Sequence, residues 1–209
     1  MTPRDDEILT ALTSKVRFFS LEQIAREFWA EGPNGIRLAR NRLIVLAGAG
    51  WLKKVRVLAR PLLFLKKPVW EWTPESPPPD CMAISRQLKN RWKMPARETD
   101  LFLASDKARG IFGGCVLGKV KNLCQTTHDL HVSEMFLRCR NLSPALVDAW
   151  VGEDEISRRG DETKIPDAYL KNVDGGMARV LEFGGSYSPS RVCEFHAYCA
   201  EKPVSYELW

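Results

Sequence analysis

The sequence of 209 residues predicts an α+β protein with two structural parts. Residues 1–72 show helix-period patterns followed by two strand-like runs, and residues 126–209 follow the order α-β-β-β-α-β. Four prolines within residues 73–80 separate the two parts, because proline lacks an amide donor and fixes φ. We therefore expect domains at 1–75 and 126–209, joined by a proline-rich and basic region at 76–125.

The N-terminal part predicts three short helices and a ribbon. Residues 4–16 carry apolar side chains at helical spacing, and Ser20 with Gln23 forms a capping-box pattern for a second helix that stops near Gly32. A third helix begins at Asn34 or Gly35. Strand-like runs at 51–58 and 61–72 follow. Three helices followed by a two-stranded ribbon form the winged helix-turn-helix plan.

Charge is distributed unevenly along the chain. Residues 20–70 hold ten Lys/Arg and three Glu, a net charge of +7, and residues 86–121 have a net charge of +6. Residues 122–209 have a net charge of −5. Two basic segments followed by an acidic one indicate that the N-terminal part of the chain binds a polyanion and that the C-terminal part is rich in carboxylates.

The basic residues indicate double-stranded DNA as the partner. In a winged helix the third helix enters the major groove, where arginine contacts guanine or phosphate, and affinity falls steeply with salt. Winged helices also serve as protein-interaction modules, and basic residues are often only a solvated face, so both alternatives stay open. The candidate DNA-binding residues are Arg37, Arg40 and Arg42 on the third helix, Lys53, Lys54 and Arg56 on the wing, and Arg86, Lys89 and Arg91 on a basic helix near Trp92.

The C-terminal part predicts a mixed sheet with helices against it. Residues 126–149 form one helix or a broken pair, interrupted near Ser143-Pro144. Strand candidates follow at 150–157, 165–171 and 177–183, with a hairpin turn at 174–176. Ser188 and Pro189 begin a further helix, and residues 203–209 close the chain as a strand.

Three carboxylates could form a site in this part. Glu134 lies on the predicted helix, Asp167 on the second strand and Glu182 on the third. Opposed residues on antiparallel strands have Cβ atoms about 5 Å apart, so Asp167 and Glu182 could share a divalent cation. Mg²⁺ takes one or two carboxylates together with water and phosphate. The alternative is that both residues are solvated carboxylates on a half-exposed sheet.

These residues resemble two known groups of proteins. The element order with Glu134, "PD" at 166–167 and Glu182 is similar to the PD-(D/E)xK nucleases, whose fold is restriction-endonuclease-like. The whole arrangement, with "HDLHVSE" at 128–134, resembles the replication-relaxation family of bacterial plasmid and mobile-element proteins. The resemblance implies Asp167 and Glu182 as Mg²⁺ ligands, Glu134 as an auxiliary acid, and a role in DNA replication, relaxation or mobilisation.

The sequence departs from the nuclease pattern at Gly184, where that superfamily carries a lysine. Loss of one preorganised electrostatic group costs roughly a hundred- to a thousand-fold in rate. The candidates to replace it are Arg191, on the first turn of the following helix, and Lys164 or Lys171, which flank the strand of Asp167; of these, Lys164 or Arg191 is preferred. Three functions follow as alternatives: a DNA-binding protein with a degenerate nuclease-like domain, an active Mg²⁺-dependent endonuclease, or a winged-helix transcriptional regulator.

The six cysteines show no CxxC pair, and no secretory segment or run of eighteen apolar residues is present. We therefore expect reduced thiols, a cytoplasmic location and no membrane contact. The sequence leaves the oligomeric state open, a homodimer included.

Overall fold

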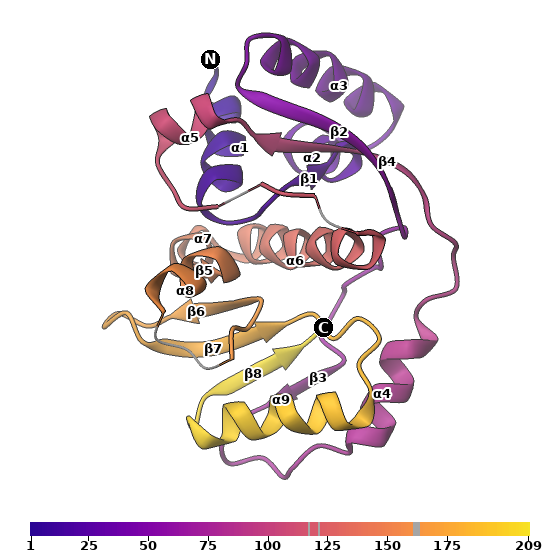
Figure 1. Ribbon diagram of the computed structural model, residues 1–209, viewed down its shortest axis with the longest axis vertical. Coiled ribbons are helices and arrows are strands. Elements are labelled where there is room, and N and C mark those ends of the chain that lie inside the picture. Colours follow the sequence, from indigo (N-terminus) through magenta and orange to yellow (C-terminus); the bar gives the residue numbers. More distant parts are fainter. Residues whose placement is uncertain (117, 121, 161–163) are drawn as a thin grey trace. The chain divides into compact units, whose positions relative to one another are not determined.

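The computed structural model describes residues 1–116, 118–120, 122–160 and 164–209 and has a mixed α+β architecture (Figure 1). The chain forms two compact units, each built from two segments. Unit 1 comprises Met1–Leu62 and Pro95–Arg138, and unit 2 comprises Leu63–Met94 and Cys139–Trp209. These limits differ from the predicted boundaries at 75 and 126, because the chain crosses between the units three times.

Unit 1 contains four complete helices, three strands and most of a fifth helix among its described residues. In chain order these are α1 (Pro3–Ser14), β1 (Phe19–Ser20), α2 (Leu21–Phe28), α3 (Pro33–Gly48), β2 (Leu52–Ala59), β4 (Arg97–Ala104), α5 (Asp106–Phe112) and α6 (Leu123–Leu142), the last of which continues past Arg138 into unit 2. The Ser20–Gln23 capping box is confirmed, and Thr2 with Asp5 forms a second one on α1. Each box satisfies amide groups that a helix start leaves unpaired.

The sheet of unit 1 has the order β1-β4-β2, and both pairings are antiparallel. Leu52 to Ala59 of β2 pair with Ala104 to Arg97 of β4. The prediction that residues 51–58 pair with residues 61–72 is therefore wrong, because the partner of β2 is β4. Pro61 has no amide hydrogen to donate immediately after β2, and β3 (Trp70–Trp72) pairs in the sheet of unit 2.

A buried apolar layer lies under the unit 1 sheet. Phe18, Ala59, Leu101 and Leu103 pack with Leu130 of α6. Ile8 of α1 and Ile24 of α2 are also fully buried. Through Leu130 this layer joins β2 and β4 to α6 within the unit.

Unit 2 contains a five-stranded sheet of order β3-β8-β7-β6-β5. The β5-β6-β7 segment is antiparallel, β7 and β8 are parallel, and β3 is antiparallel to β8. Its other elements, in chain order, are α4 (Cys81–Asn90), α7 (Pro144–Ala149), β5 (Trp150–Gly152), α8 (Glu153–Arg159), β6 (Ala168–Lys171), β7 (Met177–Glu182), α9 (Pro189–Glu201) and β8 (Ser205–Leu208).

Local signals placed most elements of this unit correctly. The break between α6 and α7 at Ser143 is confirmed, as is the start of α9 at Ser188 and Pro189. The strand predicted at 150–157 ends at Gly152, and α8 follows it. Three consecutive acidic residues, Glu153 to Glu155, lie in the first turn of α8, where they interact favourably with the helix dipole.

Helices α4 and α9 cover one face of this sheet and pack against each other. Ile84 and Leu88 of α4 and Phe195 of α9 join Val180 and Tyr206 of the strands in one buried cluster. The candidate carboxylates lie on this face as well. Every second side chain of a strand points to the same side, so residues 180, 182 and 184 of β7 and its extension share one face.

Two cysteines differ from the expectation of reduced thiols. Cys81 and Cys193 form a disulfide, whereas Cys115, Cys124, Cys139 and Cys199 are free. Spacing along the sequence did not indicate this pair, which is 112 residues apart. Within the described parts of the chain, no helix has the length and apolar character needed to cross a membrane.

Candidate functional site

The structure brings Asp167 and Glu182 together at one end of the hairpin formed by β6 and β7. Ala168 pairs with Leu181, so Asp167 and Glu182 are the next opposed residues. The Asp167 amide donates to Glu182 Oε2 at 3.1 Å, and the Phe183 amide donates to Asp167 Oδ2 at 2.7 Å. Both residues are buried, with relative exposures of 8% and 3%. The alternative of solvated carboxylates on a half-exposed sheet is therefore excluded.

Tyr187 is a third member of this site. Its hydroxyl donates to Glu182 Oε1 at 2.5 Å. Burial raises the pKa of Tyr187 above its usual value, and the charges of Glu182 and Asp167 raise it further. The phenol is therefore neutral and acts as a donor to the carboxylate.

Lys164 places a buried ammonium group near the pair. Its Nζ makes no hydrogen bond to the described residues and lies 5.0 Å from the Phe195 ring centroid and 5.7 Å from that of Tyr198. Burial lowers the pKa of Lys164, and the charge of Glu182 opposes that shift. The aromatic faces stabilise the cation in place of hydrogen-bond acceptors.

Arg191, the other predicted replacement for the missing lysine, lies on the first turn of α9. Its guanidinium carbon is 5.4 Å from the Tyr187 ring centroid, and its Nη1 is 3.8 Å from Glu194 Oε2. A hydrogen bond with Tyr187 raises the pKa of Arg191. Arg191 therefore reaches Glu182 through Tyr187.

A steric reason accounts for the glycine at position 184. A Cβ atom at Gly184 would lie 2.8 Å from Leu88 Cδ1 and 3.1 Å from Leu208 Cδ1. Real Cβ atoms essentially never come within 3.0 Å of another heavy atom, so the Leu88 side chain would have to move to admit a Cβ atom here. The fully buried Leu88 of α4 thus occupies the space that the lysine of the nuclease pattern would need.

Glu134, the predicted auxiliary acid, belongs to unit 1 and has other partners. Arg26 Nη2 donates to both of its carboxylate oxygens, at 2.8 and 2.9 Å, and Gln23 Nε2 donates to Oε2 at 3.0 Å. Asp129, from the same "HDLHVSE" segment, pairs with Arg17 at 3.3 Å. The acids of this segment tie α6 to the N-terminal elements of unit 1, which assigns them a structural role.

Helix α3 presents two of its three predicted arginines to solvent. Arg37 and Arg40 are exposed, and Arg37 contacts only the nearby Asn34, at 2.8 Å, in the described structure. Arg42 instead binds the buried Asp5, with Nε to Oδ1 at 3.0 Å and Nη2 to Oδ2 at 2.5 Å. The structure gives Arg42 a structural role, the binding of Asp5, instead of the predicted contact with DNA.

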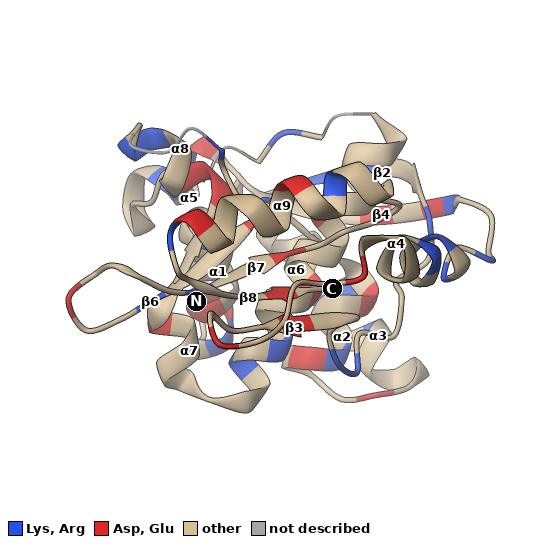
Figure 2. Cartoon of the chain, turned by 90° about the horizontal axis from the view of Figure 1, so that it is seen from below, with Lys and Arg blue, Asp and Glu red and all other residues tan. Residues whose placement is uncertain are grey.

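The predicted cations of the wing are paired with carboxylates. Lys54 Nζ lies 2.9 Å from Asp100, and Arg56 Nε lies 3.0 Å from the same residue. Lys53 Nζ lies 3.1 Å from Asp106, although both side chains are more than half exposed. Figure 2 shows that the chain carries both acidic and basic residues, and here the acids of β4 and α5 neutralise the cations of β2. The wing is therefore much less basic than the count of its Lys and Arg residues suggested.

A cavity of about 380 Å³ in unit 1 is lined by parts of α2, α3, β2 and β4. Its charged residues are Arg40, Arg56, Glu22, Glu98 and Asp100. Because acids outnumber arginines here, a phosphate group is not expected to bind inside this cavity. Arg40, which lines it, is nevertheless exposed.

On α4, Arg86 and Lys89 are exposed, but Arg91 is not available to a ligand. Arg91 Nη2 donates to the Trp209 carbonyl at 3.1 Å, and burial lowers its pKa to about 10. Trp92 Nε1 donates to the Gly185 carbonyl at 2.9 Å. Arg91 and Trp92 therefore hold the chain that follows α4 against unit 2.

Comparison of the chain with protein-family models, with curated proteins and with solved structures gave no significant match.

Sequence reasoning missed Tyr187, Leu88 and the disulfide as parts of this region. Gly184 was the one available signal, because a glycine in place of a long side chain indicates a close neighbour. Nothing in the sequence identified Leu88 as that neighbour.

Proposed function

We propose that this protein binds double-stranded DNA through unit 1, as a winged-helix protein of the replication-relaxation type that handles plasmid or mobile-element DNA. The observation that carries the proposal is the connectivity of unit 1. Its elements run α1-β1-α2-α3-β2-β4 around a sheet of order β1-β4-β2, a helix-turn-helix followed by a two-stranded wing. The exposed Arg37 and Arg40 of α3 are then the residues that enter the major groove.

Unit 2 is proposed to be a nuclease-like domain whose site is degenerate. The order α7, β5, α8, β6, β7, α9 and β8 within the unit, which α6 precedes along the chain, supports the nuclease-like part, as does the carboxylate pair on the β6–β7 hairpin. Leu88 against Gly184 supports the degenerate part, since the lysine position is filled by α4. The resemblance at residues 128–134 remains the basis for the replication-relaxation assignment.

Removal of both exposed arginines of α3 tests DNA binding. We expect Arg37→Ala/Arg40→Ala to weaken binding to a duplex at least tenfold in fluorescence anisotropy at moderate salt. Each lost phosphate contact lowers the slope of log affinity against log salt by about 0.9, so the double variant should lower it by about 1.8. Because both side chains are exposed, the fold should be unaffected.

The matched control is Arg158→Ala, which removes an exposed arginine from α8 of unit 2. It should change affinity less than twofold. Equal losses in the control and in the α3 variant would mean that only net charge matters, and would exclude α3 as the recognition helix. A truncation before residue 128 is unsuitable for this purpose, because α6 up to Arg138 is part of unit 1.

The second candidate function is a Mg²⁺-dependent endodeoxyribonuclease, and the buried ammonium of Lys164 near Glu182 favours it. Across the described chain, no group of three acidic, histidine or cysteine residues could hold a metal ion. Two carboxylates with water nevertheless suit Mg²⁺, and Asp167 and Glu182 would hold it. The ion would supply an activated water and stabilise the departing oxygen. Lys164 would hold positive charge near the phosphate.

A supercoiled-plasmid assay separates the two candidates. We expect the wild-type protein to shift the plasmid on a gel without nicking it, in either Mg²⁺ or Mn²⁺, because α4 fills the position of the motif lysine. Nicking that Asp167→Asn and Glu182→Gln abolish would establish the endonuclease instead. Glu194→Gln, which changes an acid on α9 whose side chain is 62% exposed, is the control and should have no effect.

A further inference from the structure

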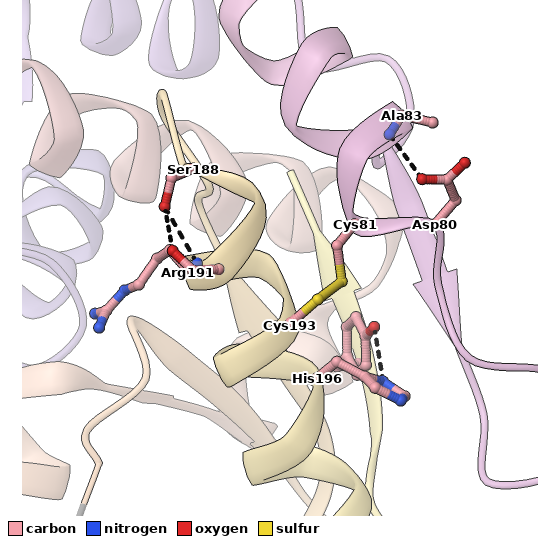
Figure 3. The surroundings of a disulfide bond; sticks show 9 residues. Asp80, Cys81, Ala83, Ser188, Arg191, Cys193 and His196 are labelled. Atoms are coloured by element: carbon pink, nitrogen blue, oxygen red, sulfur yellow. Dashed lines mark hydrogen bonds between the residues drawn. A yellow bond between two sulfur atoms is a disulfide. The ribbon is translucent and has the colours of Figure 1, made fainter.

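Helix α4 is fastened to α9 by a disulfide at its first residue. Cys81 is a half-buried residue and Cys193 an exposed one, so the bridge lies near the surface of unit 2. Figure 3 shows the bridge between the two helices, with Asp80 capping α4 at the Ala83 amide. The bridge therefore joins the first residue of a short helix to an exposed residue of α9.

The face of α4 that carries Cys81 also packs, further along the helix, on the segment that follows β7. Leu88 packs against Gly184, and Ser85 Oγ donates to the Tyr187 carbonyl at 2.7 Å. Trp92, just after α4, binds the Gly185 carbonyl. This segment also supplies the Phe183 amide and the Tyr187 hydroxyl that bind Asp167 and Glu182. Through these contacts α4 holds in place the groups that enclose the carboxylate pair.

We propose that α4 is a cap on the Asp167–Glu182 pair and that the Cys81–Cys193 disulfide is a reducible latch on this cap. A helix of ten residues is marginal in isolation, so its position depends on packing and on the covalent link. With the bridge cut, α4 opens more often, and the segment from Phe183 to Tyr187 loses its cover. The inference concerns unit 2 alone and is independent of DNA binding by unit 1.

The chemistry of release is thiol–disulfide exchange with a dithiol. A thiolate of the dithiol attacks Cys193 Sγ, the S–S bond breaks, and Cys81 leaves as a thiolate that takes up a proton. The second thiolate of the reductant then attacks the mixed disulfide and releases Cys193, which is protonated in turn. Cys81 and Cys193 gain two electrons and two protons, and the dithiol becomes a cyclic disulfide.

Amide hydrogen exchange measured by NMR tests this inference. Thiol titration of the denatured, unreduced protein should first give four free thiols from six cysteines. With dithiothreitol, we expect at least tenfold faster exchange at Ile84, whose amide donates to the carbonyl of the N-cap residue Asp80. We expect the same at Asp167 and Phe183, whose amides donate to the carboxylates. Amides in the β6–β7 ladder should keep their rates.

Two variants complete the design. Cys81→Ser/Cys193→Ser should exchange quickly in α4 without reductant and should not respond to it. Cys115→Ser/Cys124→Ser, which removes two free thiols of unit 1, should behave as wild type. Three results would each overturn the latch: six free thiols at the start, unchanged exchange in α4 on reduction, or equal acceleration across the β6–β7 ladder. The last would show that the bridge stabilises the whole unit rather than α4.

Discussion

Replacing Gly184 by lysine, which restores the nuclease sequence pattern, is expected to destabilise unit 2 rather than to create an active enzyme. The new Cβ would lie 2.8 Å from Leu88 and 3.1 Å from Leu208, both buried. Overpacking of this kind costs about 1–3 kcal/mol. The longer side chain then has to displace α4, so we expect Gly184→Lys to lower the free energy of unfolding by at least this amount in urea denaturation, and to cause no plasmid nicking.

A double-mutant cycle identifies Leu88 as the cause. Leu88→Ala alone should cost about 2–5 kcal/mol through the cavity it leaves. In Leu88→Ala/Gly184→Lys the lysine fills part of that cavity. The loss in free energy of unfolding of the double variant should therefore be smaller than the sum of the two single losses by about 1 kcal/mol or more. Additive effects would show that Leu88 does not determine the residue at position 184.

Gly110→Lys is the matched control for the substitution itself. Gly110 lies in α5, is exposed, and a Cβ there would meet nothing within 4 Å. Because glycine is unfavourable inside a helix, this change should be neutral or stabilising by up to about 1 kcal/mol. Its contrast with Gly184→Lys separates steric conflict from the general effect of adding a lysine.

Protonation of Asp5 is expected to destabilise unit 1 in acid. The Arg42 hydrogen bonds hold the pKa of this buried carboxyl at about 2, below its usual 3.8. A carboxyl whose pKa is lowered by folding stabilises the folded state at pH values above its unfolded-state pKa. That stability is lost as the pH falls towards the folded-state pKa. We expect a contribution of about 2 kcal/mol at neutral pH, lost between about pH 5 and pH 2.

Asp5→Asn compared with Asp6→Asn measures this contribution. Both residues lie in the first turn of α1, but Asp6 is exposed. At pH 7 the free energy of unfolding of Asp5→Asn should be about 2 kcal/mol below that of wild type. That of Asp6→Asn should lie within about 0.5 kcal/mol of wild type. At pH 2 the Asp5→Asn deficit should shrink. A deficit of constant size at both pH values would show that the charge of Asp5 is not its source.

Local features of the fold could be predicted because they depend on residues a few positions apart. The Ser20–Gln23 box and the Ser188-Pro189 start of α9 are contacts within one helical turn. The pairing of Asp167 with Glu182 depends on a single short hairpin, whose register places the two residues opposite each other. Its burial was not predictable, because α4 comes from a distant part of the chain.

The errors came from contacts between distant segments. The partner of β2 was sought in the adjacent run at 61–72, but it is β4, after an excursion through unit 2. That excursion brings Asp100 to Lys54 and Arg56, and so alters the charge of the wing. Glu134, expected beside the carboxylate pair, is bound instead by Arg26 of α2.

The sequence by itself determined most helices, the caps at Ser20 and Ser188, the hairpin with its two opposed carboxylates, and the exposed Arg37 and Arg40 of α3. Only the tertiary structure decided which cations stay available, what fills the place of the motif lysine, and which cysteines are joined. The physical reason is that caps and hairpins are stabilised within a few residues. Ion pairs, the Leu88–Gly184 contact and the Cys81–Cys193 bridge form only after folding brings distant segments together.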